Sequence, residues 1–324
     1  MSANDFPTGI AAQPKAELHL HLEGAIRPAV AVRLAARHGV HLQEGEVRSR
    51  YAYGSFPEFI EAFKWVTAFL QEPQDFALLA VDLADHLIEQ NVRYAEVTLS
   101  VGVMLLREQN PQANFEAVLE ATEPYEGRGL RINWIFDAVR QFGPRHATDV
   151  VEWAHRCASK RVVAFGIGGD ELSVPTAEFQ AAYRRAAQYG FHRVMHAGEL
   201  GGPELIREAV ELLGAERIGH GIAAVHDPRL MDSLLERKIV LELCPTSNVY
   251  TGALARQLGR ASVRITDHPL PFLLRRGIPV VLSSDDPAMF HTSIGEEYRH
   301  AHEMGLNATE LELLVANGFR YAFS

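Results

Sequence analysis

The stretch Glu17-Leu18-His19-Leu20-His21-Leu22-Glu23-Gly24 alternates leucine with polar residues and carries two histidines two positions apart. In a β-strand, residues i and i+2 point to the same face, so His19 and His21 would project side by side from one strand. Glu23 continues that face, and Gly24 allows the chain to turn away. Two imidazoles on a rigid face suit a metal such as zinc. A buried strand with two hydrogen-bonded histidines fits this stretch equally well, so the rest of the chain must supply the partners.

Seven further strand-like runs follow this stretch, and helix-like segments lie between them. The strand-like runs are Val92–Leu99, Arg131–Val139, Val162–Ile167, Arg193–His196, Arg217–Gly221, Ile239–Cys244 and Pro279–Ser283. The helical segments are Asn114–Glu126, Ala147–Ser159, Thr176–Tyr189, Pro203–Leu213, Pro228–Arg237 and Pro269–Arg276. Alternation of this kind predicts a parallel sheet, and eight units predict closure into an α/β fold of the (β/α)8 TIM barrel type.

Residues of about 25–91 form a helical insertion after the first strand, within a single barrel domain that we expect to span residues 1–324. The sequence predicts helices at Pro28–Gly39, Phe56–Phe69 and Gln74–Gln90, with a loop at Glu44–Gly54. The second of these helices has an aromatic face. Core packing is the default interpretation of such a face, and a lid over an apolar ligand is the more specific one.

Composition limits the classes of function. With 47% apolar residues the chain can bury a sizeable core, and its net charge of −10 without a basic run argues against nucleic acid and an anionic membrane surface as partners. The only cysteines, Cys157 and Cys244, form no disulfide framework and fit a reducing cytoplasmic setting. We expect no signal peptide in residues 1–14 and no membrane-spanning run.

Ionisable and glycine-rich groups gather at the predicted strand ends, where the active sites of such barrels lie. His19, His21, His196 and Asp285 offer three nitrogens and one oxygen, with room for the water that a catalytic zinc site retains. No lysine follows the fourth strand, where a carboxylated lysine would bridge two metals. We therefore expect one Zn²⁺ per chain.

Three further residues accompany these ligands at the predicted strand ends. Glu199 follows His196 by three positions, so it lies near the metal yet is free to move protons. His220 stands between two glycines, which allow the backbone to crowd close. Asp286 directly follows Asp285, although an Asp-Asp-Pro sequence is also typical of a helix N-terminus.

These residues belong to six motifs that together resemble the adenosine deaminase family of the metal-dependent amidohydrolase superfamily. The resemblance runs from about residue 15 to 298, in the order of the family. The motifs are His19-Leu20-His21-Leu22-Glu23-Gly24, Gly168-Gly169-Asp170-Glu171, His196-Ala197-Gly198-Glu199, Gly219-His220-Gly221, Cys244-Pro245-Thr246-Ser247-Asn248 and Ser284-Asp285-Asp286-Pro287.

The resemblance implies zinc bound by His19, His21, His196 and Asp285, and hydrolytic loss of the amino group at C6 of a purine. In such enzymes the residues equivalent to Asp285 and His220 position and deprotonate the attacking water. The equivalent of Glu199 protonates ring N1, a general-acid contribution of typically ~10²–10⁴-fold. The backbone N–H of Gly169 would contact N3 of the purine, and Asp286 would contact N7.

Two departures from the family pattern bear on the substrate. Adenosine-specific members usually have aspartate where this chain has Glu23, at the contact with the 5′-hydroxyl of the sugar. Adenine deaminases share the glutamate, but they usually have leucine where this chain has Thr246. Other members with glutamate accept 5′-modified adenosines such as 6-aminodeoxyfutalosine.

We therefore expect a deaminase of an adenosine-like nucleoside, with adenine or a 5′-modified adenosine as alternative substrates. Another mononuclear amidohydrolase reaction would not need Glu199 or Asp286, and a non-catalytic binding barrel would not need the complete ligand set. The small purine is the only partner that we expect, the oligomeric state is left open, and relatives commonly continue through a further helix beyond residue 324.

Overall fold

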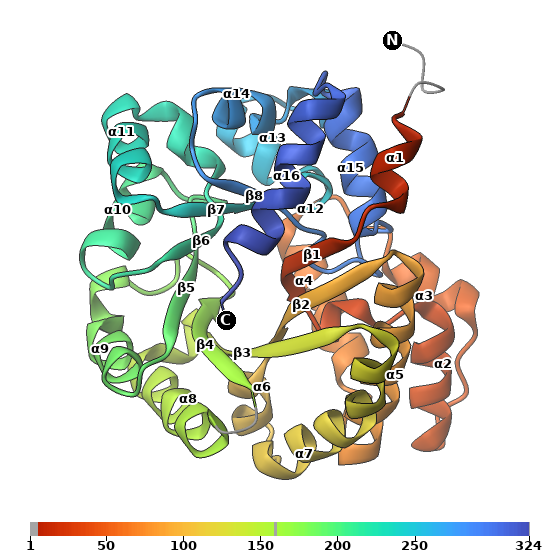
Figure 1. The fold of residues 1–324 in the computed structure, drawn as a ribbon. Coiled ribbons are helices and arrows are strands. Elements are labelled where there is room, and N and C mark those ends of the chain that lie inside the picture. Colours follow the sequence, from red (N-terminus) through yellow and green to blue (C-terminus); the bar gives the residue numbers. More distant parts are fainter. Residues whose placement is uncertain (1–5, 159–160, 324) are drawn as a thin grey trace.

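The computed structural model describes residues 6–158 and 161–323, in which eight parallel strands form one sheet in the order β1 to β8. Figure 1 shows the strands as a ring with helices around it, which confirms the predicted (β/α)8 barrel. The strands are β1 (Lys15–His21), β2 (Val92–Leu99), β3 (Arg131–Val139), β4 (Val162–Gly168), β5 (His192–Ala197), β6 (Arg217–His220), β7 (Val240–Leu243) and β8 (Val280–Leu282).

Residues of the predicted metal site themselves join the two ends of the sheet. The His21 N–H donates to the carbonyl of Asp285 at 2.9 Å, and the Asp285 N–H donates to the carbonyl of His19 at 3.1 Å. This pairing continues as a parallel bridge between Leu20 and Asp285. The segment after β8 is therefore fixed against β1 at the point where the ligand side chains emerge.

The helices that cover the barrel follow the alternation seen in the sequence. They are α6 (Val101–Leu106), α7 (Pro111–Thr122), α8 (Gly143–Cys157), α9 (Gln180–Gln188), α10 (Pro203–Glu211), α11 (Pro228–Arg237), α12 (Pro245–Tyr250), α13 (Ala253–Leu258), α14 (Leu270–Arg275), α15 (Ile294–Glu303) and α16 (Ala308–Arg320). The predicted segment 147–159 corresponds to α8, and its last residue, Ser159, lies outside the described residues. Among the described residues, no helix combines the length and apolar character needed to cross a membrane.

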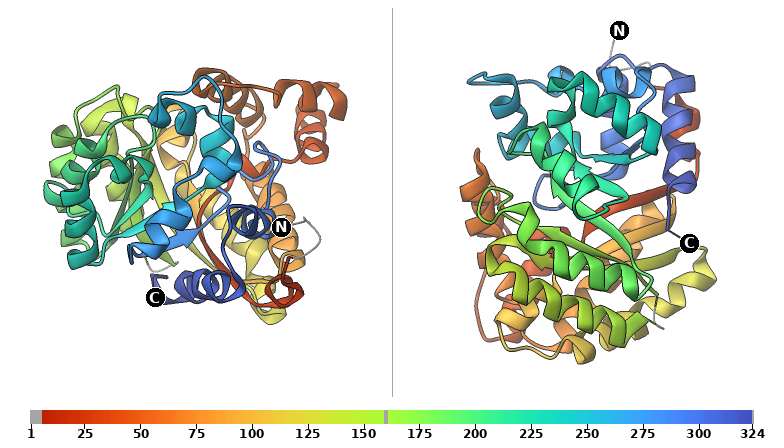
Figure 2. Two further views of the ribbon diagram at one scale, coloured as in Figure 1. Left: turned by 90° about the horizontal axis from the view of Figure 1, so that it is seen from above. Right: turned by 90° about the vertical axis from the view of Figure 1, so that its left-hand side faces the viewer.

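The insertion after β1 stands to one side of the barrel (Figures 1 and 2). Besides the short α1 (Thr8–Ala12) ahead of β1, the chain forms α2 (Pro28–Arg37), α3 (Glu44–Arg50), α4 (Phe56–Thr67) and α5 (Pro73–Glu89). The predicted loop at 44–54 is wrong over its first part, because α3 forms there. Gln43 and Glu46 make a capping box at its start, and the side chain of Val47 is buried beneath it.

Candidate active site

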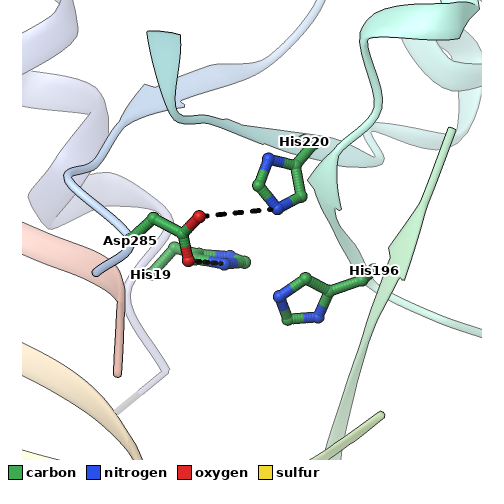
Figure 3. Close-up of side chains that lie close together, drawn as sticks. All are labelled: His19, His196, His220 and Asp285. Carbon is green, nitrogen blue, oxygen red and sulfur yellow. Dashed lines mark ion pairs between the residues drawn. The ribbon is translucent and has the colours of Figure 1, made fainter. Parts of the chain in front are cut away.

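Four side chains that the sequence places far apart meet at the C-terminal end of the barrel. One ligand atom from each of His19, His196, His220 and Asp285 lies within 4.8 Å of the others. Figure 3 shows the Asp285 carboxylate between the rings of His19 and His220. His21 adjoins this group, with its Nε2 3.3 Å from Asp285 Oδ1. All four predicted ligands are thus brought together, with His220 beside them.

Backbone geometry at the site is strained in two places. His220 has φ of 60° and Asp285 has φ of 66°, a left-handed region that residues with a side chain rarely adopt. Gly219 meets a different constraint, because a Cβ there would lie 2.7 Å from Cε1 of His19. Strain of this kind persists only where surrounding structure enforces it, and it gathers at functional sites.

Hydrogen bonds behind two of the rings direct their free nitrogens towards the centre. Nδ1 of His19 lies 2.6 Å from Glu242 Oε2, and Nδ1 of His196 lies 3.2 Å from the carbonyl oxygen of Ile167. Each ring donates its Nδ1 proton to that oxygen, which turns its Nε2 atom towards the centre of the site. The Nε2 atom of His19 is buried without a hydrogen-bond partner in the described structure. A carboxylate behind a histidine is the usual support of a metal ligand.

The charges at the site suit a bound cation. Burial lowers the pKa of His19, but the nearby carboxylates of Asp285 and Glu242 outweigh it and raise the pKa to about 10, so a cation bound here would take the place of the second ring proton. Burial lowers the pKa of His21 and His196 to about 3, so these two rings are neutral and able to coordinate. Buried carboxylates beside neutral imidazoles are the donor set that zinc prefers. The residues present therefore fit a metal ion.

Glu199 is held as a buried acid across the cavity from the ligands. Its Oε2 lies 3.8 Å from Nε2 of His220. Burial, reinforced by the charge of Asp285, raises the pKa of the Glu199 carboxyl well above its usual range. A raised pKa favours the protonated form of the carboxyl, which is the form that can donate a proton.

The loop that carries Glu199 is fixed by Glu171. The Glu171 carboxylate accepts hydrogen bonds from the backbone N–H groups of Gly198, at 2.8 Å, Leu200 and Gly201. These three donors flank Glu199 on both sides, so Glu171 sets the position of the acid. The three backbone N–H groups on this carboxylate give the Gly168-Gly169-Asp170-Glu171 motif a definite structural role.

A cavity of about 320 Å³ opens above these residues and has mostly apolar walls. The aromatic face of α4 covers one side through Phe56, Phe59 and Phe63. Phe59 also packs against Phe290, with 4.9 Å between ring centroids. The predicted aromatic helix thus serves the core and the cavity at once, and its action as a lid stays a prediction.

Polar groups at the floor of the cavity include Gly169 and Asp286, two of the predicted substrate contacts. Asp286 Oδ1 is buried without a hydrogen-bond partner in the described structure. Gly24 makes room for this carboxylate, because a Cβ at position 24 would overlap it. No helix begins at Pro287, and the segment turns instead through bonds from the N–H groups of Met289 and Phe290 to the Asp286 carbonyl.

Glu23 lies deeper than the sequence suggested. Its Oε1 accepts a hydrogen bond from the Ser100 N–H at 3.0 Å, and its Oε2 is buried without a partner in the described structure. It lines a small cavity of about 10 Å³, which shares Ser100, Thr67 and Arg107 with the main cavity. Burial raises the pKa of Glu23 to about 7.

Two acidic residues of the site were not singled out from the sequence. Glu242, which supports His19, lies on β7 two residues before the Cys244-Pro245-Thr246-Ser247-Asn248 motif, and the sequence analysis gave it no role. Asp137 at the end of β3 lines the main cavity, and burial raises its pKa well above the usual value. A search for ionisable residues near the end of every predicted strand would have found both.

Comparison with known proteins agrees with this geometry. The family described as adenosine deaminase matches residues 14–324. An aminodeoxyfutalosine deaminase of Streptomyces coelicolor is 36% identical over 98% of this chain and 82% of its own length.

Two solved structures share the fold. An adenine deaminase from Arthrobacter aurescens is 29% identical, with a TM-score of 0.89 over 97% of this chain and 94% of that one. An amidohydrolase from Burkholderia ambifaria with bound Zn is 26% identical, with a TM-score of 0.87 over 97% of this chain and 87% of that one. The chain therefore belongs to the adenosine deaminase family and is an aminohydrolase that acts on adenine-type purines.

Proposed function

We propose that this protein is a zinc-dependent hydrolytic deaminase that converts an adenosine-like 6-aminopurine nucleoside to its 6-oxo product and ammonia. The observation that carries the proposal is the position of a buried carboxyl group, that of Glu199, beside His220 and next to a cluster of metal-type ligands. A buried acid and an activated water are the two components that nucleophilic displacement at a purine carbon requires.

His19, His21, His196 and Asp285 would hold one zinc ion per chain. When bound, zinc lowers the pKa of a coordinated water towards ~7 and so supplies a nucleophile near neutral pH. The free Nε2 atom of His19 and the zinc bound in the Burkholderia ambifaria relative support this metal. Gly168 at the end of β4, in place of a lysine, supports a single ion.

The protein side chains divide the proton transfers between them. Asp285 accepts a proton from the attacking water, while His220 holds that water in place. Glu199 protonates ring N1, so that negative charge does not build up on the ring as C6 becomes tetrahedral. Asp285 would then pass the proton taken from water to the amino group, which leaves as ammonia, and the proton of the new 6-hydroxyl would return to Glu199 as the 6-oxo purine forms.

Groups at the floor of the cavity would orient the base. The backbone N–H of Gly169 would donate to N3, and the protonated carboxyl of Asp286 would donate to N7. Burial and the charge of Asp285 raise the pKa of Asp286 well above its usual range, which suits a donor to an unprotonated ring nitrogen. The aromatic side chains of α4 suit the faces of a planar base.

An adenosine-like substrate is favoured because Glu23 borders a small cavity that shares Thr67, Ser100 and Arg107 with the main one. The Oε2 atom of Glu23, which has no hydrogen-bond partner in the described structure, could accept a hydrogen bond from a sugar hydroxyl. Free adenine has no sugar and could not make this bond. Adenine remains the second candidate, because an adenine deaminase shares the fold at a TM-score of 0.89. A 5′-modified adenosine is the third, because of the likeness to the aminodeoxyfutalosine deaminase. The cysteine content of the chain, Cys157 and Cys244 without a disulfide framework, supports the reducing, cytoplasmic setting expected from the sequence.

Steady-state assays test the proposal directly. Adenosine, adenine, a 5′-modified adenosine and AMP would be compared by the change in ultraviolet absorbance on deamination. We expect the highest kcat/KM for an adenosine-like nucleoside and the lowest for AMP, because buried acids disfavour a phosphate. A higher kcat/KM for adenine than for any nucleoside would make adenine the preferred substrate. Hydrolysis of a cyclic amide without deamination of any purine would overturn the proposal.

A further inference from the structure

A line of three buried side chains runs from the outer layer of the barrel to His220. His268 precedes α14, Asn248 lies on α12 and His220 ends β6. His268 Nε2 is 3.1 Å from Asn248 Oδ1, and Asn248 Nδ2 is 3.0 Å from His220 Nδ1. None of the three is more than 3% exposed. The line contacts the active site only through the face of His220 that points away from the cavity.

The direction of this line is set at its outer end. The backbone N–H of Leu270 points at His268 Nδ1 over 3.2 Å, and a backbone N–H can only donate. Nδ1 of His268 is therefore an acceptor, and the ring must carry its proton on Nε2. That proton is donated to Asn248 Oδ1, so the amide turns its N–H₂ group towards His220.

The opposite orientation of the Asn248 amide fails on the same grounds. It would direct an N–H group of Asn248 at the Nε2–H of His268, and both would be donors. It would also direct a carbonyl oxygen at His220 Nδ1. Only one arrangement gives every donor an acceptor, and buried polar groups are nearly always paired in this way.

His220 consequently accepts at Nδ1 and carries its proton on Nε2. That nitrogen faces Glu199 Oε2 at 3.8 Å and Asp285 Oδ2 at 3.9 Å. Burial lowers the pKa of both His220 and His268 to about 3, in agreement with neutral rings. The state of His220 is the reverse of that of His19 and His196, whose Nδ1 atoms face oxygen acceptors.

We propose that Asn248 and His268 are positioning residues that hold His220 in the tautomer protonated on Nε2, as a hydrogen-bond donor to the attacking water. This inference deepens the proposed function and rests on it for the identity of the water. A nitrogen that carries a proton has no lone pair for a metal. His220 is therefore excluded from the ligand set although it lies as close as the ligands do, and Asp285 is left as the group that accepts the proton.

Substitution of Asn248 by aspartate replaces the N–H donor that faces His220 with an acceptor and hardly changes the shape of the side chain. A carboxylate accepts from both neighbours, so Asn248→Asp should move the His220 proton from Nε2 to Nδ1. We expect kcat to fall by about 10–100-fold, as is typical when a supporting partner of an active-site group is changed, with KM unchanged. Asn317→Asp is the matched control, because the buried Asn317 amide donates to the Val280 carbonyl at 2.9 Å instead of to a histidine.

The tautomer itself can be read without any turnover. In ¹⁵N-histidine-labelled protein, purified with its metal, long-range ¹H–¹⁵N spectra separate protonated from unprotonated ring nitrogens, and His220→Gln identifies the signals of His220. We expect a protonated Nε2 in the natural sequence and a protonated Nδ1 in Asn248→Asp. An unprotonated Nε2 in the natural sequence, or the same tautomer in both proteins, would overturn the proposal.

His268 provides an independent test if Asn248→Asp fails to fold. His268→Gln retains an N–H donor for Asn248 and should keep kcat near that of the natural sequence. His268→Leu removes the donor, allows the amide to turn and should lower kcat at unchanged KM. Equal activity of these two variants would contradict a positioning role. Failure of the natural sequence to deaminate purines would refute the proposed function and leave the spectra to decide the tautomer.

Discussion

The two ends of the barrel bury similar polar residues but treat them differently. At the C-terminal end, His19 Nε2, Asp286 Oδ1 and Glu23 Oε2 are buried without hydrogen-bond partners in the described structure. At the N-terminal end, Arg217 pairs with Glu96 and donates to the Tyr321 carbonyl at 2.9 Å, and its Nε lies 2.5 Å from Glu242, the residue that also supports His19.

The end of the chain closes that N-terminal opening, near the centre of the ring in Figure 1. The Phe323 ring lies 3.7 Å from the Arg217 guanidinium, and the Phe323 N–H donates to Glu96 at 2.5 Å. Partnered polar groups stabilise one state of the chain, whereas unpartnered ones cost free energy until a ligand binds. The comparison assigns stability to one end and chemistry to the other, which is the division expected of such barrels.

Glu199→Gln should impair catalysis at the C-terminal end of the barrel without changing stability, and it should give the largest effect of the three substitutions. Glutamine keeps the size of the side chain but cannot donate a carboxylic proton. We expect kcat to fall by ~10²–10⁴-fold, with the metal content and the thermal unfolding unchanged. Glu204→Gln, at an exposed position nearby, is the control. Loss of the metal with activity retained in the reloaded protein would instead make Glu199 a ligand.

Glu96→Gln should lower the stability supplied by the N-terminal end of the barrel without changing catalysis. The change leaves the buried Arg217 guanidinium without one of its counter-charges, and removing one partner of a buried pair typically costs about 3–5 kcal/mol. Chemical denaturation would measure the loss in unfolding free energy, with the exposed Glu123→Gln as control. We expect kcat of the folded variant to stay near that of the natural sequence. A large fall in kcat at unchanged stability would show that the two ends are not separable.

Glu23→Ala should give a smaller effect. It tests whether Glu23, at the C-terminal end of the barrel, contacts the sugar of the substrate. Loss of a hydrogen bond between a substrate hydroxyl and a carboxylate costs about 1.5–3 kcal/mol, so kcat/KM for adenosine should fall about tenfold or more. Free adenine has no sugar and should be spared. Equal losses for both substrates would mean that Glu23 supports Ser100 and the fold, and the adenine alternative would gain support.

Much of the fold was predictable because each strand of the barrel has a local signal. The eight predicted strands agree with the observed ones to within a few residues. The helix predicted to end at Gly39 ends at Arg37, and Gly39 has a φ of 72° just beyond it. The sequence analysis did not predict α3 in the insertion or five helices that cover the barrel, α6, α12, α13, α15 and α16. α3 buries only Val47 within its span, and α12 and α13 are each six residues long, too short for a helical pattern to emerge.

The site was predictable to the extent that its residues occupy motifs. The ligands and Glu199 follow strand ends, and the barrel brings strand ends together. Glu242 and His268 act through a second residue, and no local spacing announces a contact across 223 positions, as between His19 and Glu242. The burial of Glu23 depends on the packing of the segment after β1 against Ser100 at the start of α6. Tertiary packing of this kind leaves no local pattern in the sequence.

Anomalous diffraction at the zinc edge, from crystals of protein purified without added metal, tests the central claim most directly. The account predicts one peak per chain at the C-terminal end of the barrel, within bonding distance of His19, His21, His196 and Asp285, and with His220 outside the ligand set. Two peaks per chain, or a fully active protein without a peak, would contradict the single-metal centre on which the proposed function rests.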